Sequence, residues 1–205
     1  YPYTVVSLYE AQIVREGVVQ QKGTLAAMIA AATSSDTIQL LKDVVSDARF
    51  SITKTLTIDG QGHTIAVNNN DNRVIDISDT SDVTLTLKNV MIDGSNVKVD
   101  LSYPRGISMY RNTNVKLLLD NASVSAGHYA VNVASENTGV EIEIKNSSVA
   151  SGWAALNVWS PATISVTGSE LSGTNNKSFD AAGGNNFSTI VLNNGAQDSE
   201  LTFSN

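Results

Sequence analysis

The sequence contains no cysteine, little proline and few aromatic residues. Without cysteine among its 205 residues, the chain cannot form a disulfide framework, a thiolate zinc site or a thiol nucleophile. Only 3 prolines are present, and aromatic residues make up 6% of the chain. The fold therefore depends on the 41% of hydrophobic residues, which suffice for the core of one domain.

The chain also lacks long apolar runs and clusters of basic residues. No run approaches the roughly 20 apolar residues of a membrane-spanning helix, so we expect no membrane insertion. The N-terminus, Tyr1-Pro2-Tyr3-Thr4, does not have the basic-then-apolar order of a signal peptide. The 13 basic residues are scattered among 20 acidic ones, and the net charge is −7. This charge distribution argues against nucleic acid as a partner.

What the sequence does have is an internal repeat. Four segments alternate between apolar and polar residues with period two, and each ends on asparagine or glycine: residues 83–89, 115–121, 140–146 and 162–168. The alternation predicts half-buried strands. Asparagine and glycine adopt a left-handed backbone most readily, so the shared last position predicts a sharp corner.

Each repeat holds two further strands. A short strand follows each corner, at residues 90–94, 122–125, 147–152 and 169–173. Another precedes each repeat, at residues 74–78, 106–110, 130–134 and 155–159. The steps between corners are 32, 25 and 22 residues, which fits one coil of three strands with insertions in the longer steps. We therefore predict an all-β fold, a single-stranded right-handed parallel β-helix.

The charges on the outward positions agree with this stacking. In a parallel stack, Lys88, Asp120 and Lys145 form one column, and Lys116 and Glu141 belong to another. Unlike charges then become neighbours across adjacent coils, which supports this register.

The N-terminal region predicts a cap. Apolar residues at helical spacing in residues 24–32, with Thr24 as N-cap, predict a short helix that covers the first coil. We expect an N-terminal segment and capping helix in residues 1–36 and the parallel β-helix in residues 37–205. Because the chain stops at a corner in the middle of a coil, we expect it to be a fragment of a longer protein.

Three segments of the N-terminal half resemble a known family. Residues 24–32, 36–44 and 56–65 are similar to the opening of the pectate-lyase-like right-handed β-helix superfamily, in the form found in bacterial surface proteins. The resemblance extends over residues 24–205 and implies the fold. The superfamily includes lyases, hydrolases, adhesins and passive stalks, so the fold does not decide the function.

The catalytic motifs of that superfamily are missing. The chain contains no Trp-Ile-Asp-His stretch, no adjacent pair of aspartates and no Gly-His-Gly; Gly62-His63-Thr64 lacks the second glycine. The run 76–82 offers oxygens for calcium, but it has neither the glycine nor the spacing of a dedicated loop. We therefore expect no catalytic residues, no metal site and no cofactor.

One face of the predicted solenoid combines polar and aromatic side chains. Asp76, Ser108, Asn132 and Asn157 form an outward column, with Tyr110 and Trp159 beside it. The insertions 95–104 and 174–187 enter next to this face, and Tyr103, Arg105, Tyr129 and Trp153 lie at the same border. Aromatic rings beside polar groups can bind a sugar, so these ten residues are our candidate ligand-binding site. The alternative is that the aromatic residues pack beneath the insertions.

From these features we expect a non-catalytic adhesion or stalk module of a bacterial surface or secreted protein. It would be extracellular or on the cell surface, with weak carbohydrate binding and a glycan or host-cell ligand as partner. The first alternative is a polysaccharide lyase or glycoside hydrolase of the same fold, in which Asp76 would be the first residue to mutate. A tail-spike-like phage fibre is the second alternative.

Overall fold

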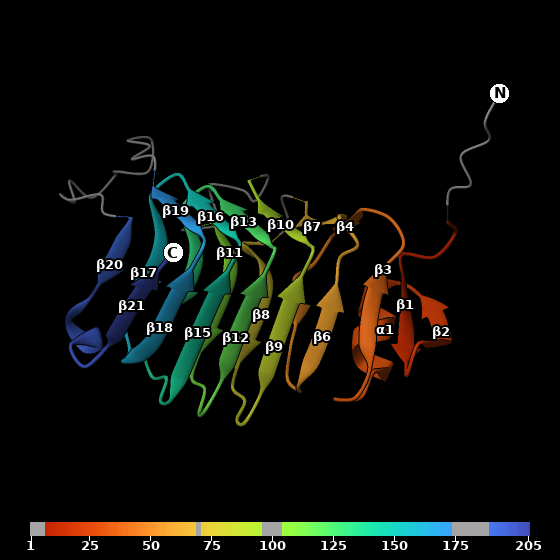
Figure 1. Ribbon diagram of the computed structural model, residues 1–205, viewed down its shortest axis with the longest axis horizontal. Helices are drawn as coiled ribbons and strands as arrows, with labels where there is room; N and C mark the ends of the chain where they lie inside the picture. The colour runs from red at the N-terminus through yellow and green to blue at the C-terminus, as the bar shows by residue number, and fades with distance from the viewer. Residues whose placement is uncertain (1–6, 69–70, 96–103, 174–188) are drawn as a thin grey trace.

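The computed structural model describes residues 7–68, 71–95, 104–173 and 189–205, which form a parallel β-helix (Figure 1). Short strands stack into three sheets, and the chain visits the sheets in the same order on every turn. From β3 to β20, the described strands make six turns of three strands each. The predicted all-β solenoid is therefore confirmed.

The three sheets are named A, B and C. Sheet A contains, in spatial order, β2 (Val18–Gly23), β1 (Ala11–Arg15), β3 (Thr37–Leu40), β6 (Leu56–Asp59), β9 (Thr84–Lys88), β12 (Lys116–Asp120), β15 (Val140–Lys145), β18 (Ala162–Thr167) and β21 (Glu200–Ser204). Sheet B contains β19 (Glu170–Gly173), β16 (Ser148–Ser151), β13 (Ser123–Ala126), β10 (Met91–Gly94), β7 (Thr64–Val67) and β4 (Val44–Ser46). Sheet C contains β20 (Ile190–Leu192), β17 (Ala154–Val158), β14 (Tyr129–Val133), β11 (Arg105–Tyr110), β8 (Arg73–Ser78) and β5 (Phe50–Ser51).

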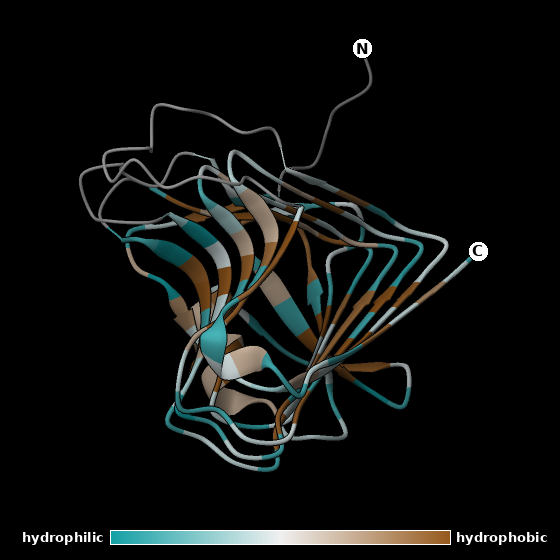
Figure 2. Ribbon diagram, turned by 90° about the vertical axis from the view of Figure 1, so that its left-hand side faces the viewer, coloured by the Kyte–Doolittle hydropathy of each residue, from teal (hydrophilic) through white to brown (hydrophobic). Residues whose placement is uncertain are grey.

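The core consists of ladders of apolar side chains that run along the solenoid. In sheet A, Leu85, Leu117, Ile142 and Ile164 pair in register on successive turns, and all four are buried. Viewed along the solenoid axis, the three sheets enclose the core, and hydrophobic residues alternate with hydrophilic ones along the strands (Figure 2). Burial of each such side chain stabilises the fold by about 1.5–3 kcal/mol.

The corners between sheets A and B have the predicted backbone. Asn89, Asn121, Asn146 and Gly168 have φ angles of 49°, 49°, 48° and 54°. Asparagine tolerates this left-handed conformation better than other residues with a Cβ, and glycine tolerates it freely. One left-handed residue therefore follows each of the strands β9, β12, β15 and β18 and turns the chain into sheet B.

The predicted capping helix is also present. Helix α1 (Leu25–Ala31) buries Leu25, Met28 and Ile29. The Oγ1 atom of Thr24 accepts a hydrogen bond of 3.2 Å from the backbone N–H of Ala27, as expected for an N-cap.

A β-hairpin that the sequence analysis did not predict joins this cap. Strands β1 and β2 pair antiparallel, and β1 pairs antiparallel with β3. Glu16 and Gly17 have φ angles of 51° and 78°, as in the tight turns that favour hairpins. Arg15 donates from Nε to Oδ1 of the buried Asp36 at 2.7 Å. This hydrogen bond holds the pKa of Asp36 well below its usual range and fixes the hairpin against the loop before β3.

The first charge column has the predicted register but different ion pairs. Asp120 lies beside both Lys88 and Lys145. Among the described residues, however, Lys88 pairs with Asp59 at 3.4 Å, and Lys145 pairs with Glu143 at 2.8 Å. The predicted stacking of this column is therefore confirmed, although both lysines form their ion pairs with other carboxylates. Lysine side chains are long enough to reach carboxylates outside their own column, so register alone does not select the partner.

In the second column the predicted contact is present. Lys116 lies in register with Glu141, at 3.7 Å. The Nζ atom of Lys116 makes a closer contact with Glu143, which also lowers the pKa of the Glu143 carboxyl. Lys116 therefore contacts both glutamates, and Glu143 contacts both Lys116 and Lys145.

Candidate functional site

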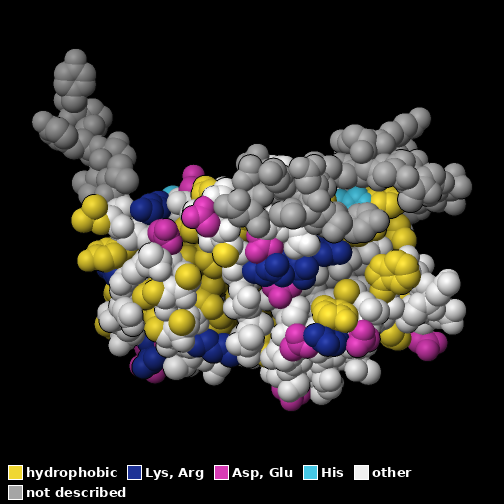
Figure 3. All heavy atoms as spheres, turned by 180° about the vertical axis from the view of Figure 1, so that it is seen from behind, with side chains coloured by type: hydrophobic (Ala, Val, Ile, Leu, Met, Phe, Trp, Pro, Cys, Tyr) yellow, Lys and Arg dark blue, Asp and Glu magenta, His cyan; other side chains and the backbone are white. Residues whose placement is uncertain are grey.

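A cleft of about 640 Å³ opens on the outer face of sheet C. We call it the sheet C cleft. Residues of four successive turns line it, among them Arg105, Tyr129, Asn132, Trp153, Asn157 and Trp159. Figure 3 shows the side of the molecule where basic and acidic side chains gather near hydrophobic ones. The structure thus brings together six of the ten predicted site residues.

The predicted polar column lies along this sheet. Asp76 pairs in register with Ser108, Ser108 with Asn132, and Asn132 with Asn157. The predicted stacking of these four positions is therefore confirmed.

The column is not an exposed one, however. Ser108, Asn132 and Asn157 are only 1–2% exposed. Asn157 donates from Nδ2 to Oδ1 of Asn132 at 2.7 Å, and Asn132 donates to Oγ of Ser108 at 3.4 Å. Asn193 donates to Oδ1 of Asn157 at 2.9 Å and continues the ladder. The amides can be buried because each satisfies the next, so they form a rigid floor for the cleft.

One wall of the cleft is aromatic. The ring of the fully buried His128 lies 3.9 Å from the ring of Tyr129 and 4.0 Å from that of Trp153. Tyr129 and Trp153 stack on each other at 5.5 Å. Burial and the nearby charge of Arg105 lower the pKa of His128 to about 3, so the imidazole is neutral at physiological pH. Trp159, at 45% exposure, is the most accessible ring of the cleft.

Arg105 differs from its basic neighbours. Arg73 pairs with Asp76 at 2.7 Å, and Arg49 pairs with Asp71 at 2.9 Å. Among the residues that the structure describes, no carboxylate lies within ion-pair distance of Arg105, and its buried Nε atom has no hydrogen-bond partner. Burial and the adjacent charge of Arg73 lower the pKa of Arg105. A negative ligand group in the cleft would compensate this charge.

The other predicted residues lie elsewhere. Tyr110 donates from its hydroxyl to Oε1 of Glu136 at 3.0 Å, and the guanidinium of Arg111 lies 4.7 Å from its ring centroid. Tyr110 does not line the cleft. Asp76 is occupied by its ion pair with Arg73. Tyr103 lies outside the described residues, as do residues 96–103 and 174–187 of the two insertions beneath which the alternative places the aromatic residues.

The sequence analysis missed several cleft residues near the C-terminus. Val191 lies in register with Asn157, and Asn193 follows one turn after Trp159. The repeat spacing gave only a weak signal for these residues, because this turn carries the longest insertion. Equivalent residues in sheet A, such as Thr167 and Ser204, are 37 positions apart.

The described residues show neither a metal centre nor a membrane span. No group of three or more histidine, aspartate or glutamate side chains in the described ranges could hold a metal ion. No helix in the described part of the chain is both long and apolar enough to cross a bilayer.

Comparisons of the chain with protein-family models, with curated proteins and with solved structures find no match. The function is therefore inferred from the geometry of the cleft.

Proposed function

We propose that the chain is a non-catalytic adhesion or stalk module of a bacterial surface or secreted protein, and that its sheet C cleft binds an acidic glycan. The observation that carries this proposal is the position of Arg105, a cation without an ion-pair partner among the described residues, in a cleft that also holds aromatic rings and amides. The resemblance of residues 24–65 to pectate-lyase-like surface proteins agrees with it.

The aromatic and amide groups suit a sugar. A pyranose ring has an apolar face that packs on an aromatic ring, and its hydroxyls need both donors and acceptors. Trp159 offers an accessible ring, and the exposed hydroxyl of Ser135 and the half-buried amide of Asn193 offer polar atoms above the buried ladder. Because the amide ladder is rigid, these groups are already ordered before a ligand binds, which lowers the entropic cost of binding.

Arg105 supports an acidic ligand over a neutral one. A guanidinium binds a carboxylate through two parallel hydrogen bonds, and such contacts are stronger where water is excluded. Arg105 is largely buried and lies beside another arginine, so its charge is poorly compensated without a ligand.

The lining of the cleft supports binding without hydrolysis. Glycoside hydrolysis by the usual route needs two carboxyl groups about 5–9.5 Å apart. The described residues that line the cleft include no aspartate or glutamate. Asp76, the acid nearest in the column, is held by Arg73 at 2.7 Å.

The test is a glycan array of neutral and carboxylated oligosaccharides, followed by calorimetry with the best ligand. We expect carboxylated glycans to bind, and Trp159→Ala to weaken binding about tenfold because a stacked ring is lost. Arg105→Gln should remove the preference for carboxylated glycans over their neutral counterparts.

Tyr110→Ala is the matched control, because Tyr110 is an aromatic residue of the same sheet that does not line the cleft. It should bind like the unmodified chain. Equal binding by Trp159→Ala and Tyr110→Ala, or no glycan bound at all, would refute the proposal. Release of reducing ends, or of unsaturated uronates absorbing in the ultraviolet, would establish the enzyme alternative instead.

A further inference from the structure

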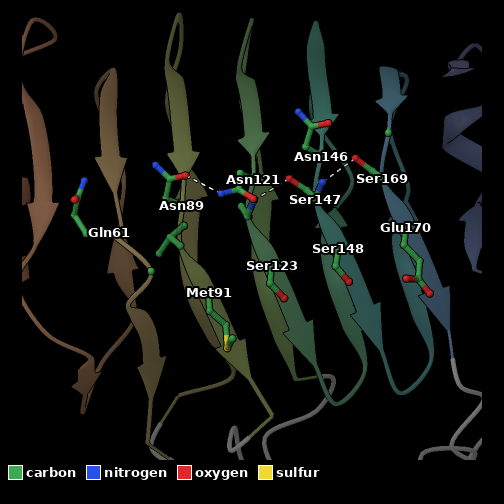
Figure 4. Close-up of a pocket in the computed structure, with 14 residues that line it drawn as sticks. Gln61, Asn89, Met91, Asn121, Ser123, Asn146, Ser147, Ser148, Ser169 and Glu170 are labelled. Carbon is green, nitrogen blue, oxygen red and sulfur yellow. Dashed lines mark hydrogen bonds between the residues drawn. The ribbon is translucent and has the colours of Figure 1, made fainter. Parts of the chain in front are cut away.

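A second hollow lies where the chain passes from sheet A to sheet B. Corners of five successive turns, from Gln61 to Glu170, line a groove of about 870 Å³ (Figure 4). We call it the corner groove. Parallel strands stack about 4.8 Å apart, so five turns give it a length of about 19 Å along the solenoid axis. Sheet C does not share this corner, and none of the groove's residues lines the sheet C cleft.

Asparagine amides form one wall of the groove. Asn89 donates from Nδ2 to Oδ1 of Asp59 at 3.1 Å, and Asn121 donates to Oδ1 of Asn89 at 2.8 Å. The ladder ends there. Asn146 is exposed, and its side-chain amide forms no hydrogen bond with any described residue. Its donor and acceptor are therefore available to a ligand, as is the remaining acceptor capacity of Asn121.

The opposite wall is high at both ends and low in the middle. Met91, Ser123, Ser148 and Glu170 lie in register on successive strands of sheet B (Figure 4). The two serines are short, whereas methionine and glutamate are long, so the central turns form a depression with hydroxyl groups at its edge. Met91 is 45% exposed and adds an apolar contact surface.

The charges and backbone of the groove narrow the class of ligand. Glu170 is the only charged residue among those described as lining it, so an anionic polymer would be repelled and not attracted. An extended peptide would need an open sheet edge, but the corner N–H groups of Asn89 and Asn121 already donate to Asp120 and Lys145 of the next turn. A row of amides and hydroxyls repeated at every turn instead suits a hydroxyl-rich polymer that lies parallel to the axis.

We propose that the corner groove binds a neutral linear polysaccharide extended along the solenoid axis. The inference does not depend on the sheet C cleft, because the two sites share no residue and differ in charge. Sugars in the central turns would hydrogen-bond Asn121, Asn146 and the two serines, and a ring face at one end would pack on Met91. A module with both sites could hold two kinds of glycan at once.

The test uses the full chain and neutral oligosaccharides of β-1,4-linked glucose, xylose or N-acetylglucosamine, followed by calorimetry or NMR titration. At least one of these series should bind, with affinity that rises with length until about four sugars fill the groove of about 19 Å. Single sugars should bind far more weakly. Ser148→Tyr fills the depression and should reduce the affinity at least about tenfold.

Two variants serve as controls. Thr163→Tyr places the same ring at an exposed position on sheet A and should leave affinity unchanged. Trp159→Ala should also leave it unchanged, which separates this site from the sheet C cleft. If Ser148→Tyr is unfolded by circular dichroism, Asn146→Gly replaces it, because glycine accepts the same φ of 48° while the amide is lost. The inference is overturned if no neutral series binds, or if the folded groove variant binds as tightly as Thr163→Tyr.

Discussion

Asparagine has two separate functions in this chain, and both depend on its short amide side chain. At the corners, Asn89, Asn121 and Asn146 take the left-handed backbone that other residues with a Cβ avoid. In sheet C, Asn132 and Asn157 keep an extended backbone and instead use their amides to satisfy one another in the interior. The same residue type therefore shapes the turns through its backbone and the cleft floor through its side chain.

His128 makes stability depend on pH. Its pKa is about 3 in the folded chain, against an ordinary value of 6.5. Below pH 6.5 the unfolded chain binds a proton that the folded chain does not, so stability is full above that pH and falls as the pH decreases toward 3. Between pH 6.5 and 4.5 we expect this residue to lower the free energy of unfolding by about 2 kcal/mol.

The measurement is urea unfolding at several pH values, for the unmodified chain and for His128→Phe, which keeps an aromatic ring packed against Tyr129 and Trp153. The variant should lose less stability across this range. The carboxylates with lowered pKa, such as Asp36, keep their full contribution above about pH 4.5 and lose it only at more acidic pH, so they add little to the change in stability across this range. Parallel pH profiles for the two proteins would contradict the assignment.

Within a single strand, consecutive residues face two different environments, the core and the outer surface. Leu117 and Leu118 are neighbours in β12 and have the same side chain. Leu117 lies between Leu85 and Ile142 in the core ladder, whereas Leu118 lies between Thr86 and Glu143 on the outer face. Period-two alternation thus decides which leucine stabilises the fold.

This pair provides an internal control. Leu117→Ala should lower the free energy of unfolding by about 2–5 kcal/mol, because it leaves a cavity in a packed ladder. Leu118→Ala should cost less than about 1 kcal/mol, since its side chain is only partly buried. Urea unfolding of both variants checks this, and equal losses would mean that the register of β12 is wrong.

For the molecule as a whole, strand pairing is complete in the middle and incomplete at the ends. Strands β9, β12 and β15 each have a neighbour on both sides in sheet A. Within the described part of the chain, strand β2 pairs only with β1, and β21 pairs only with β18. Helix α1 packs close to the β1–β2 hairpin and covers one end of the core.

Hydrogen exchange should follow this gradient. The amides of β9, β12 and β15 should exchange slowest, and those of β2 and β21 should exchange at least about tenfold faster, because local opening is easiest where backbone hydrogen bonds have one neighbour only. Mass spectrometry of peptides after hydrogen–deuterium exchange measures the exchange rates of these strands. Uniform protection from β2 to β21 would show that the solenoid opens only as a single unit.

Much of the architecture could be read from the sequence. Period-two alternation specified the strands, and the asparagine or glycine at the end of each repeat specified the corners. Together they set the register, which is why the column from Asp76 to Asn157 stacks as predicted. These signals are local, and a parallel stack repeats them on every turn.

Only the tertiary structure decided which polar groups are buried and which are available. Asn157 and Asn146 are the same residue type, yet the amide of Asn157 is buried in a hydrogen-bonded ladder, whereas Asn146 lines the corner groove. Lys88 selects Asp59 over Asp120, and Arg105 has no carboxylate near it in the described part of the chain. Such outcomes depend on distances between several turns at once, because long side chains reach past their own column, whereas the pattern along the chain specifies only which column each residue occupies.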